Sequence, residues 1–348
     1  MYRNAPGAER EPDRAKHQVN GAPDANKIRT PVEMTDELLE RFFKGDTRAL
    51  SRIITRVENR TPDSLSLLQE LFAHSGKAQI LGITGSPGAG KSTLVDRLAQ
   101  AYRQRGNMLA IVAIDPSSPF TGGAILGDRI RMQTQGIDPG VYIRSMATRG
   151  HLGGLATATA DVVTVLDAAG KNPIMVETVG VGQDEIDIVK LADVSVVVLV
   201  PGMGDDVQAL KAGIMEIGDI FVINKCDRPG VDKMERAVLA TLSLAHRADG
   251  WEPPVVKTVA TEGRGIDELV ETIGRCYSFL QNSPSRVQKK QEAARQRLVT
   301  LLEERLLKTT VQHVFPNGEF NNVVGQIADR KQDPYSIVDA IIQKLRFK

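Results

Sequence analysis

Residues 80–93 decide the fold, and they read Ile-Leu-Gly-Ile-Thr-Gly-Ser-Pro-Gly-Ala-Gly-Lys-Ser-Thr. An apolar strand is expected over the first five residues. The next nine, Gly85-Ser86-Pro87-Gly88-Ala89-Gly90-Lys91-Ser92-Thr93, match the pattern GxxxxGK[ST] and lead into an amphipathic helix. In this context successive backbone N–H groups face phosphate oxygens at a helix N-terminus. The stretch therefore predicts a nucleotide site in which Lys91 binds the β- and γ-phosphates and Ser92 is a ligand of Mg²⁺.

Outward from this motif, apolar runs of strand length alternate with helical patterns. Continuous Val and Ile runs are typical of strands buried on both faces. We therefore predict an α/β fold with a doubly wound, mostly parallel sheet across residues 79–282. The expected strands are Ile80–Thr84, Leu109–Ile114, Pro173–Glu177, Val194–Val200, Ile220–Asn224 and Val255–Thr258.

Three further segments flank the predicted sheet domain. Residues 1–32 are polar and interrupted by Pro and Gly, so we expect a disordered tail. Residues 33–78 are expected to be helical, with a first helix starting near Thr35 and a break at Thr61-Pro62-Asp63. Residues 283–348 are predicted to form a long helix that ends at Pro316-Asn317-Gly318, then a last helix with Asp333 as N-cap and Pro334 at its first position.

The sequence also indicates which base is bound. An apolar strand leads into Asn224-Lys225-Cys226-Asp227, an NKxD pattern about 130 residues beyond the Gly-rich loop. The carboxylate of Asp227 can accept hydrogen bonds from guanine N1–H and from the 2-amino group, a donor pair that adenine lacks. Asn224 is expected at the other edge of the base and Lys225 along the base and ribose. With Val259-Ala260-Thr261 at the end of the next strand, this pattern favours GTP and GDP over ATP.

Between these motifs lies the segment expected to carry the chemistry. Glu177 ends a predicted strand, where P-loop enzymes usually carry an acidic residue that holds Mg²⁺, and Gly180 is expected to offer its N–H to the γ-phosphate. Many GTPases place a water-orienting Gln directly after this glycine, but here Val181 occupies that position. The sequence thus predicts slow intrinsic hydrolysis that a partner accelerates.

Two more carboxylates, Asp115 and Asp128, flank a Pro- and Gly-rich loop that suits a nucleotide-sensing switch. Spacing alone leaves each of them equally compatible with a place near Mg²⁺ and with capping a loop. His151 lies in a Gly-rich stretch, and a structural role is favoured over catalysis because no partner is identifiable.

Composition excludes several classes of protein. The 44 basic and 43 acidic side chains give a net charge of +1, which provides no electrostatic basis for a nucleic-acid footprint. Two cysteines cannot form a disulfide framework and suit a reducing compartment such as the cytoplasm. No apolar run reaches the roughly 18 residues of a membrane helix.

Long stretches of the chain resemble the ArgK/MeaB family of P-loop GTPases, which are chaperones of adenosylcobalamin-dependent acyl-CoA mutases. The likeness runs from about residue 35 to the C-terminus. The stretches that carry it are Asp115–Met132, Ser145–Gly154 and Glu177–Gln183.

This resemblance implies more than the motifs do. It implies a homodimer held partly by the C-terminal helices, and a complex with methylmalonyl-CoA mutase in which GTP binding and hydrolysis gate cofactor loading and protect the mutase. It supports Asp115, Asp128 and Glu177 around Mg²⁺. It further implies that residues 200–211, including Asp205, Gln208 and Lys211, form a switch that responds to the mutase.

Two other functions remain open from the residues alone. A GTPase metallochaperone would share the P-loop and the glutamate-bearing strand, but the five His and two Cys of this chain are scattered. An ATP-dependent kinase of a transport component conflicts with the NKxD pattern. A comparison of GDP with ADP binding separates the kinase from both GTPases.

Overall fold

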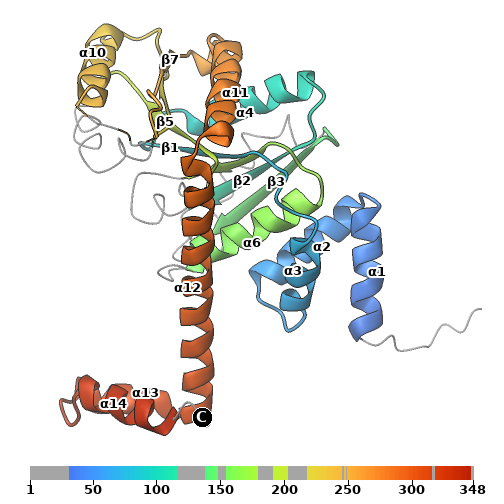
Figure 1. Cartoon of the computed structure of the whole chain (residues 1–348), viewed down its shortest axis with the longest axis vertical. Helices are drawn as coiled ribbons and strands as arrows, with labels where there is room; N and C mark the ends of the chain where they lie inside the picture. The colour runs from blue at the N-terminus through green and yellow to red at the C-terminus, as the bar shows by residue number, and fades with distance from the viewer. Residues whose placement is uncertain are drawn as a thin grey trace, which may run out of the picture.

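The computed structural model describes residues 31–115, 138–147, 154–178, 191–202, 218–244, 247, 249–315 and 318–345. Within these ranges, one sheet of seven parallel strands has the order β3-β2-β4-β1-β5-β6-β7 (Figure 1). The strands are β1 (Ile80–Gly85), β2 (Leu109–Asp115), β3 (Val141–Ala147), β4 (Ile174–Glu177), β5 (Val194–Leu199), β6 (Ile220–Ile223) and β7 (Val255–Lys257).

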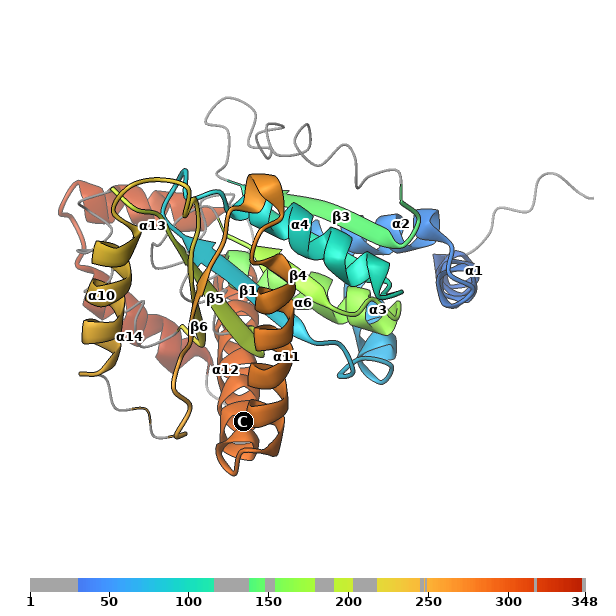
Figure 2. The same ribbon diagram turned by 90° about the horizontal axis from the view of Figure 1, so that it is seen from above.

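Helices cover both faces of the sheet, as predicted for a doubly wound fold (Figure 2). On one face, α4 (Lys91–Gln104) and α11 (Ile266–Asn282) pack in a single apolar core with residues such as Leu81 and Ile111. On the other face, α6 (Gly154–Ala168) packs on β2 and β4, while α10 (Val231–Leu242) packs on β5 and β6. β1 lies in the centre, where the chain changes direction across the sheet, and such switch points bind ligands at the carboxyl ends of the strands.

The six expected strands are confirmed, each to within one residue at either end. The sequence does not predict β3, an edge strand in which Arg144 and Ser145 interrupt the apolar residues Val141–Ile143 and Met146. An interrupted strand does not show the continuous apolar run on which the other predictions rest.

The N-terminal helices α1 (Pro31–Phe43), α2 (Thr47–Glu58) and α3 (Ser64–Phe72) pack behind α6. The start near Thr35 was wrong, since α1 begins at Pro31, a residue favoured in the first turn of a helix. Asp46 caps α2 by accepting from the N–H groups of Arg48 and Ala49. The predicted tail, residues 1–32, lies almost wholly outside the described residues.

The C-terminal arm consists of α12 (Ser285–Val314), α13 (Glu319–Ala328) and α14 (Pro334–Leu345). Figure 1 shows α12 running away from the sheet, with α13 and α14 at its far end. α14 begins as predicted, and the carboxylate of Asp333 accepts from the N–H of Ser336 at 2.8 Å. α13 was not predicted, because Asn321, Asn322 and Gly325 give its sequence a weak helical propensity.

Two ion pairs hold the middle of α12 against the rest of the chain. Arg297 of α12 donates to Asp161 of α6 at 2.9 Å and also to the hydroxyl of Thr164. Further along α12, Glu304 pairs with Arg60, which follows α2. Burial raises the pKa of Asp161, and the charge of Arg297 opposes that rise. The arm is therefore attached by charged contacts as well as by chain continuity.

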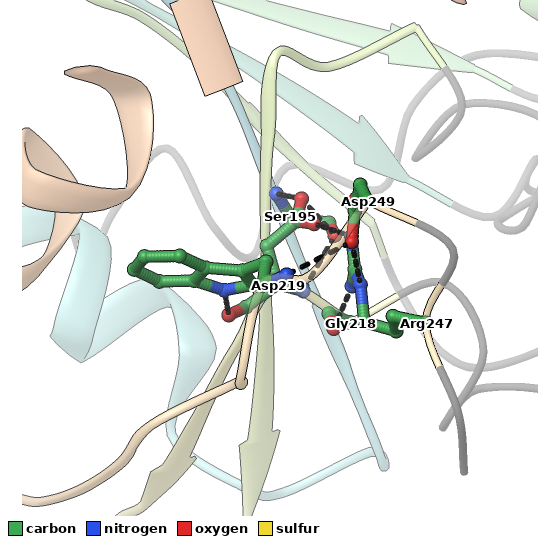
Figure 3. A network of polar contacts seen from close by, with 6 residues as sticks. Ser195, Gly218, Asp219, Arg247 and Asp249 are labelled. Atoms are coloured by element: carbon green, nitrogen blue, oxygen red, sulfur yellow. Dashed lines mark hydrogen bonds and ion pairs between the residues drawn. The ribbon is translucent and has the colours of Figure 1, made fainter. Parts of the chain in front are cut away.

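A polar cluster closes the amino-terminal ends of β5 and β6 (Figure 3). The carboxylate of Asp219 accepts from the backbone and hydroxyl of Ser195 and from Arg247, which also pairs with Asp249. Burial alone would lower the pKa of Arg247, but its hydrogen bonds to Asp249 and Asp219 raise it. Trp251 donates its indole N–H to the carbonyl of Asp219 at 2.8 Å. These satisfied bonds lie at the end of the sheet opposite the Gly-rich loop and indicate a structural role.

Candidate functional site

The Gly-rich loop joins β1 to α4 and passes close to its neighbours. Gly85 has φ +145°, and a Cβ there would lie 2.2 Å from the carbonyl oxygen of Val198 on β5. Gly90 has φ +87°, and its Cβ would lie 2.6 Å from Nδ2 of Asn224. Between them Ser86 and Ala89 are buried. Pro87, Gly88 and Thr93 are exposed. The loop can follow this path only with glycine at positions 85 and 90.

Lys91 and Ser92, the first residues of α4, point in different directions. The buried ammonium of Lys91 donates to the carbonyl oxygens of Gly85 at 2.8 Å and Ser86 at 3.1 Å, so it lies across the Gly-rich loop. The hydroxyl of Ser92 donates instead to Oε1 of Glu177 at 2.6 Å, and Glu177 is buried at the end of β4. A hydroxyl beside a carboxylate supplies the oxygen ligands that Mg²⁺ prefers, so these two residues fit the predicted metal.

The other predicted metal and phosphate residues are placed only in part. Asp115 ends β2, and because Ala113 of that strand pairs with Glu177, Asp115 lies at the same edge of the sheet. Asp128, Gly180 and His151 lie outside the described residues. So do the switch residues Asp205, Gln208 and Lys211.

Asn224 joins the two predicted halves of the site. It follows β6, is buried, and donates from Nδ2 to the carbonyl of Ala89 at 2.9 Å. Its Oδ1 accepts from the hydroxyl of Thr258 and from the N–H of Ala260, each at 3.1 Å. These bonds position the Gly-rich loop and the Val259–Thr261 loop relative to one another, and the contact of Asn224 with the base stays a prediction.

Lys225 makes a second bridge to the Gly-rich loop. It has φ +57°, and its ammonium donates to the carbonyl of Gly88 at 2.7 Å. Asp227 lies two residues further on and is exposed. Cys226 between them donates to the carbonyl of Ile223, and burial raises the pKa of its thiol. That shift disfavours the reactive thiolate and indicates a space-filling role for Cys226.

The Val259–Thr261 loop holds a contact that the sequence analysis missed. Val259 and Ala260 are buried, whereas Thr261 is exposed. The guanidinium of Arg97, on α4, donates to the carbonyls of Ala260 at 3.0 Å and Thr261 at 2.7 Å. No motif contains Arg97, and the only available signal was its place on the helix that follows the Gly-rich loop.

Known proteins resemble this chain over most of its length. Residues 50–314 match the family described as "Methylmalonyl Co-A mutase-associated GTPase MeaB". A putative GTPase of Pyrococcus abyssi is 49% identical over 90% of this chain and 97% of its own. The mouse protein "Methylmalonic aciduria type A homolog, mitochondrial" is 31% identical over 80% of this chain and 71% of its own.

A solved structure shows the same architecture. The crystal structure of a protein titled "LAO/AO transport system kinase" superposes with a TM-score of 0.64 at 25% identity, covering 92% of this chain and all of that one. The family match, the sequence relatives and the fold agree with the motifs around Lys91 and Asn224. The chain therefore belongs to the MeaB family of P-loop GTPases.

Proposed function

We propose that this protein is a Mg²⁺-dependent GTPase that binds methylmalonyl-CoA mutase and uses GTP binding and hydrolysis to gate cofactor loading and to protect the mutase from inactivation. The observation that carries the nucleotide part is the contact of Asn224 with Ala89. It joins the loop expected to bind phosphates to the loops expected to bind guanine. The mutase part rests on the family, and cytoplasmic location is proposed with it.

In this proposal each predicted site residue has a role at the nucleotide. Lys91 exchanges its carbonyl partners Gly85 and Ser86 for phosphate oxygens, as its position across the Gly-rich loop allows. Ser92 and Glu177, with Asp115 and Asp128, would hold Mg²⁺, and the bound ion would supply positive charge to neutralise the β- and γ-phosphates. Gly180 donates its N–H to the γ-phosphate, and Asp227 binds guanine N1–H and the 2-amino group.

We propose that hydrolysis is slow without a partner, because Val181 replaces the water-orienting Gln. Residues 200–211, with Asp205, Gln208 and Lys211, form the segment that responds to the mutase. Most of this segment lies outside the described residues, so the proposal rests on the family resemblance.

We further propose that the chain forms a homodimer through its C-terminal arm. Apolar side chains stand exposed along α12 to α14, which supports burial against a second copy. About half or more of the side-chain surface is exposed for Leu298, Leu302, Leu306, Leu307, Tyr335, Val338 and Ile342. Among the described residues, no helix is both long enough and apolar enough to cross a membrane.

The test is GTP turnover by the purified full-length protein, alone and with methylmalonyl-CoA mutase, using ATP as the control nucleotide. We expect slow GTP turnover that rises with the mutase, and none with ATP. Turnover of ATP would contradict the guanine assignment. Clear GTP turnover without a response to the mutase would leave the GTPase intact and exclude this partner.

A further inference from the structure

Arg97 binds the Val259–Thr261 loop from the helix that starts at the phosphate site. It lies six residues after Lys91 on α4, about 9 Å along the helix axis. Nε donates to the carbonyl of Ala260 at 3.0 Å and Nη2 donates to that of Thr261 at 2.7 Å. One planar guanidinium therefore holds two successive carbonyl groups, a geometry that the single point charge of lysine does not reproduce.

The same loop is held from its other side by Asn224. The N–H of Ala260 donates to Oδ1 of Asn224, whose Nδ2 donates to Ala89 in the Gly-rich loop. The Gly-rich loop is thus connected to Ala260 in two ways. One connection runs along α4 to Arg97, and the other runs through Asn224. Ala260 is buried and is held at both its N–H and its carbonyl.

Fixing these carbonyls also fixes backbone donors. A trans peptide places the N–H of each residue antiparallel to the preceding carbonyl. The bond from Arg97 to Ala260 therefore sets the direction of the Thr261 N–H, which faces away from Arg97. A backbone N–H with a fixed direction can donate to guanine O6, whereas adenine presents an amino donor at that position.

We propose that Arg97 is a positioning residue for guanine specificity, orienting the Val259–Thr261 backbone so that it reads O6 of the base. The inference rests on the proposed GTPase function. Arg97 is itself braced, because its Nη1 donates to Oε1 of Gln100, and Gln100 donates in turn to Asp96 of the same helix.

The test combines one change in the protein with one change in the ligand. Arg97→Met keeps an apolar stem of similar length and removes every donor. The two probes are GDP and 6-thio-GDP, in which sulfur, a weaker acceptor, replaces O6. Dissociation constants are measured with Mg²⁺ on the full-length chain, after thermal unfolding has shown that the variant is folded. ADP binding to the unaltered protein tests the guanine preference itself.

The matched control is Arg105→Met, at the C-cap of the same helix. Arg105 donates to Asp267 and to the carbonyl of Ala101, so it binds outside the Val259–Thr261 loop, and its ion pair is exposed. We expect the control to leave the affinities for GDP and 6-thio-GDP unchanged, because exposed pairs contribute little.

We expect Arg97→Met to weaken GDP binding about tenfold, and 6-thio-GDP binding less than about threefold. Arg97→Lys should recover part of the loss. If the methionine variant does not fold, the lysine variant decides the outcome. A folded lysine variant that binds GDP and 6-thio-GDP with the same affinity ratio as the unaltered protein would then overturn the proposal. Equal weakening of both probes would reveal a structural role only, and unchanged binding would remove any role. If the unaltered protein does not prefer GDP to ADP, the guanine assignment fails and this inference fails with it.

Discussion

The hydroxyl of Ser92 lies 2.6 Å from Oε1 of Glu177, although the two residues are 85 positions apart in the chain. One begins α4 and the other ends β4, so the sheet brings together the two oxygens expected at Mg²⁺. Glu177→Gln keeps the size of the side chain and removes its charge. We expect Mg²⁺-dependent GTP turnover to fall about 10- to 100-fold, with a higher Mg²⁺ requirement.

A Mg²⁺ titration of GTP turnover measures this effect. The exposed Glu252→Gln, before β7, serves as the control and should behave like the unaltered protein. An unchanged Mg²⁺ requirement in Glu177→Gln would remove Glu177 from the metal site.

Asp227 is expected to determine which base binds. Asp227→Ala removes two charge-assisted acceptors, so GDP affinity should fall at least about 100-fold while ADP affinity changes little. Competition of GDP and ADP against a fluorescent guanine nucleotide measures both affinities. Asp232→Ala, at an exposed position in the first turn of α10, is the control. Retained preference for GDP would contradict the assignment of Asp227.

Gly263 and Gly265, which follow the Val259–Thr261 loop, allow a matched comparison of two glycine substitutions. They have nearly the same backbone conformation, with φ +76° and +78°. A Cβ at Gly263 meets open space, whereas one at Gly265 would lie 2.2 Å from the carbonyl oxygen of Lys257. Gly263→Ala should therefore cost about 1–2 kcal/mol of unfolding free energy. Gly265→Ala should cost more, since β7 or α11 has to shift. Urea denaturation compares the two, and equal losses would show that the structure absorbs the clash.

The arm contact predicts a stability change that depends on pH. Arg297→Ala leaves the carboxylate of Asp161 without its ion-pair partner, which should cost about 2 kcal/mol near pH 7. Burial already raises the pKa of Asp161 above its ordinary value of 3.8, and loss of Arg297 raises it further. As the pH falls through that raised pKa, the folded variant takes up a proton before the unfolded chain does. Its loss of unfolding free energy relative to the unaltered protein therefore shrinks.

Denaturation at about pH 7 and about pH 4.5 measures the difference between variant and unaltered protein. The control is the double variant Asp161→Asn with Arg297→Ala. It lacks the carboxylate that takes up the proton, so its loss of unfolding free energy should not change with pH through that group. A deficit in Arg297→Ala that stays constant with pH would contradict the role of the Asp161 charge.

The proposed dimer predicts a response to a charge on the arm. Leu302 on α12 is 48% exposed, so Leu302→Asp should change the stability of a single chain by little. It should shift the mass measured by sedimentation from dimer to monomer, because it would bury a charge between the copies. Arg295→Asp, at a more exposed position of the same helix, is the control. An unchanged dimer in Leu302→Asp would place the interface elsewhere.

The sequence predicts those parts of the fold that a single local pattern determines, such as an apolar run or a helix-capping residue. Buried strands such as β6 consist of continuous apolar residues, and Asp333-Pro334 marks the start of α14 through local chemistry alone. β3 is not predicted because Arg144 and Ser145 interrupt its apolar residues, and α13 is not predicted because its helical propensity is weak. The formation of β3 and α13 depends more on the elements packed against them than on their own sequences.

The candidate site was predictable as a set of residues but not as a set of contacts. The motifs named Ser92, Glu177 and Asn224 without showing that Asn224 binds Ala89 and Ala260. Arg97 could not be found at all, because an arginine on an amphipathic helix is expected to be solvated. Only the packing of α4 against the Val259–Thr261 loop gives it partners.

The 30 residues of α12 make a rod about 45 Å long, and the contact of Arg297 with Asp161 lies about 26 Å from its far end. A tilt of α12 by about 5° about this contact displaces its far end by about 2 Å. α6, which carries Asp161, lies against the sheet below β2 and β4, the strands that end in Asp115 and Glu177. A tilt of α12 together with α6 would thus move α13 and α14 by about half the spacing between neighbouring strands.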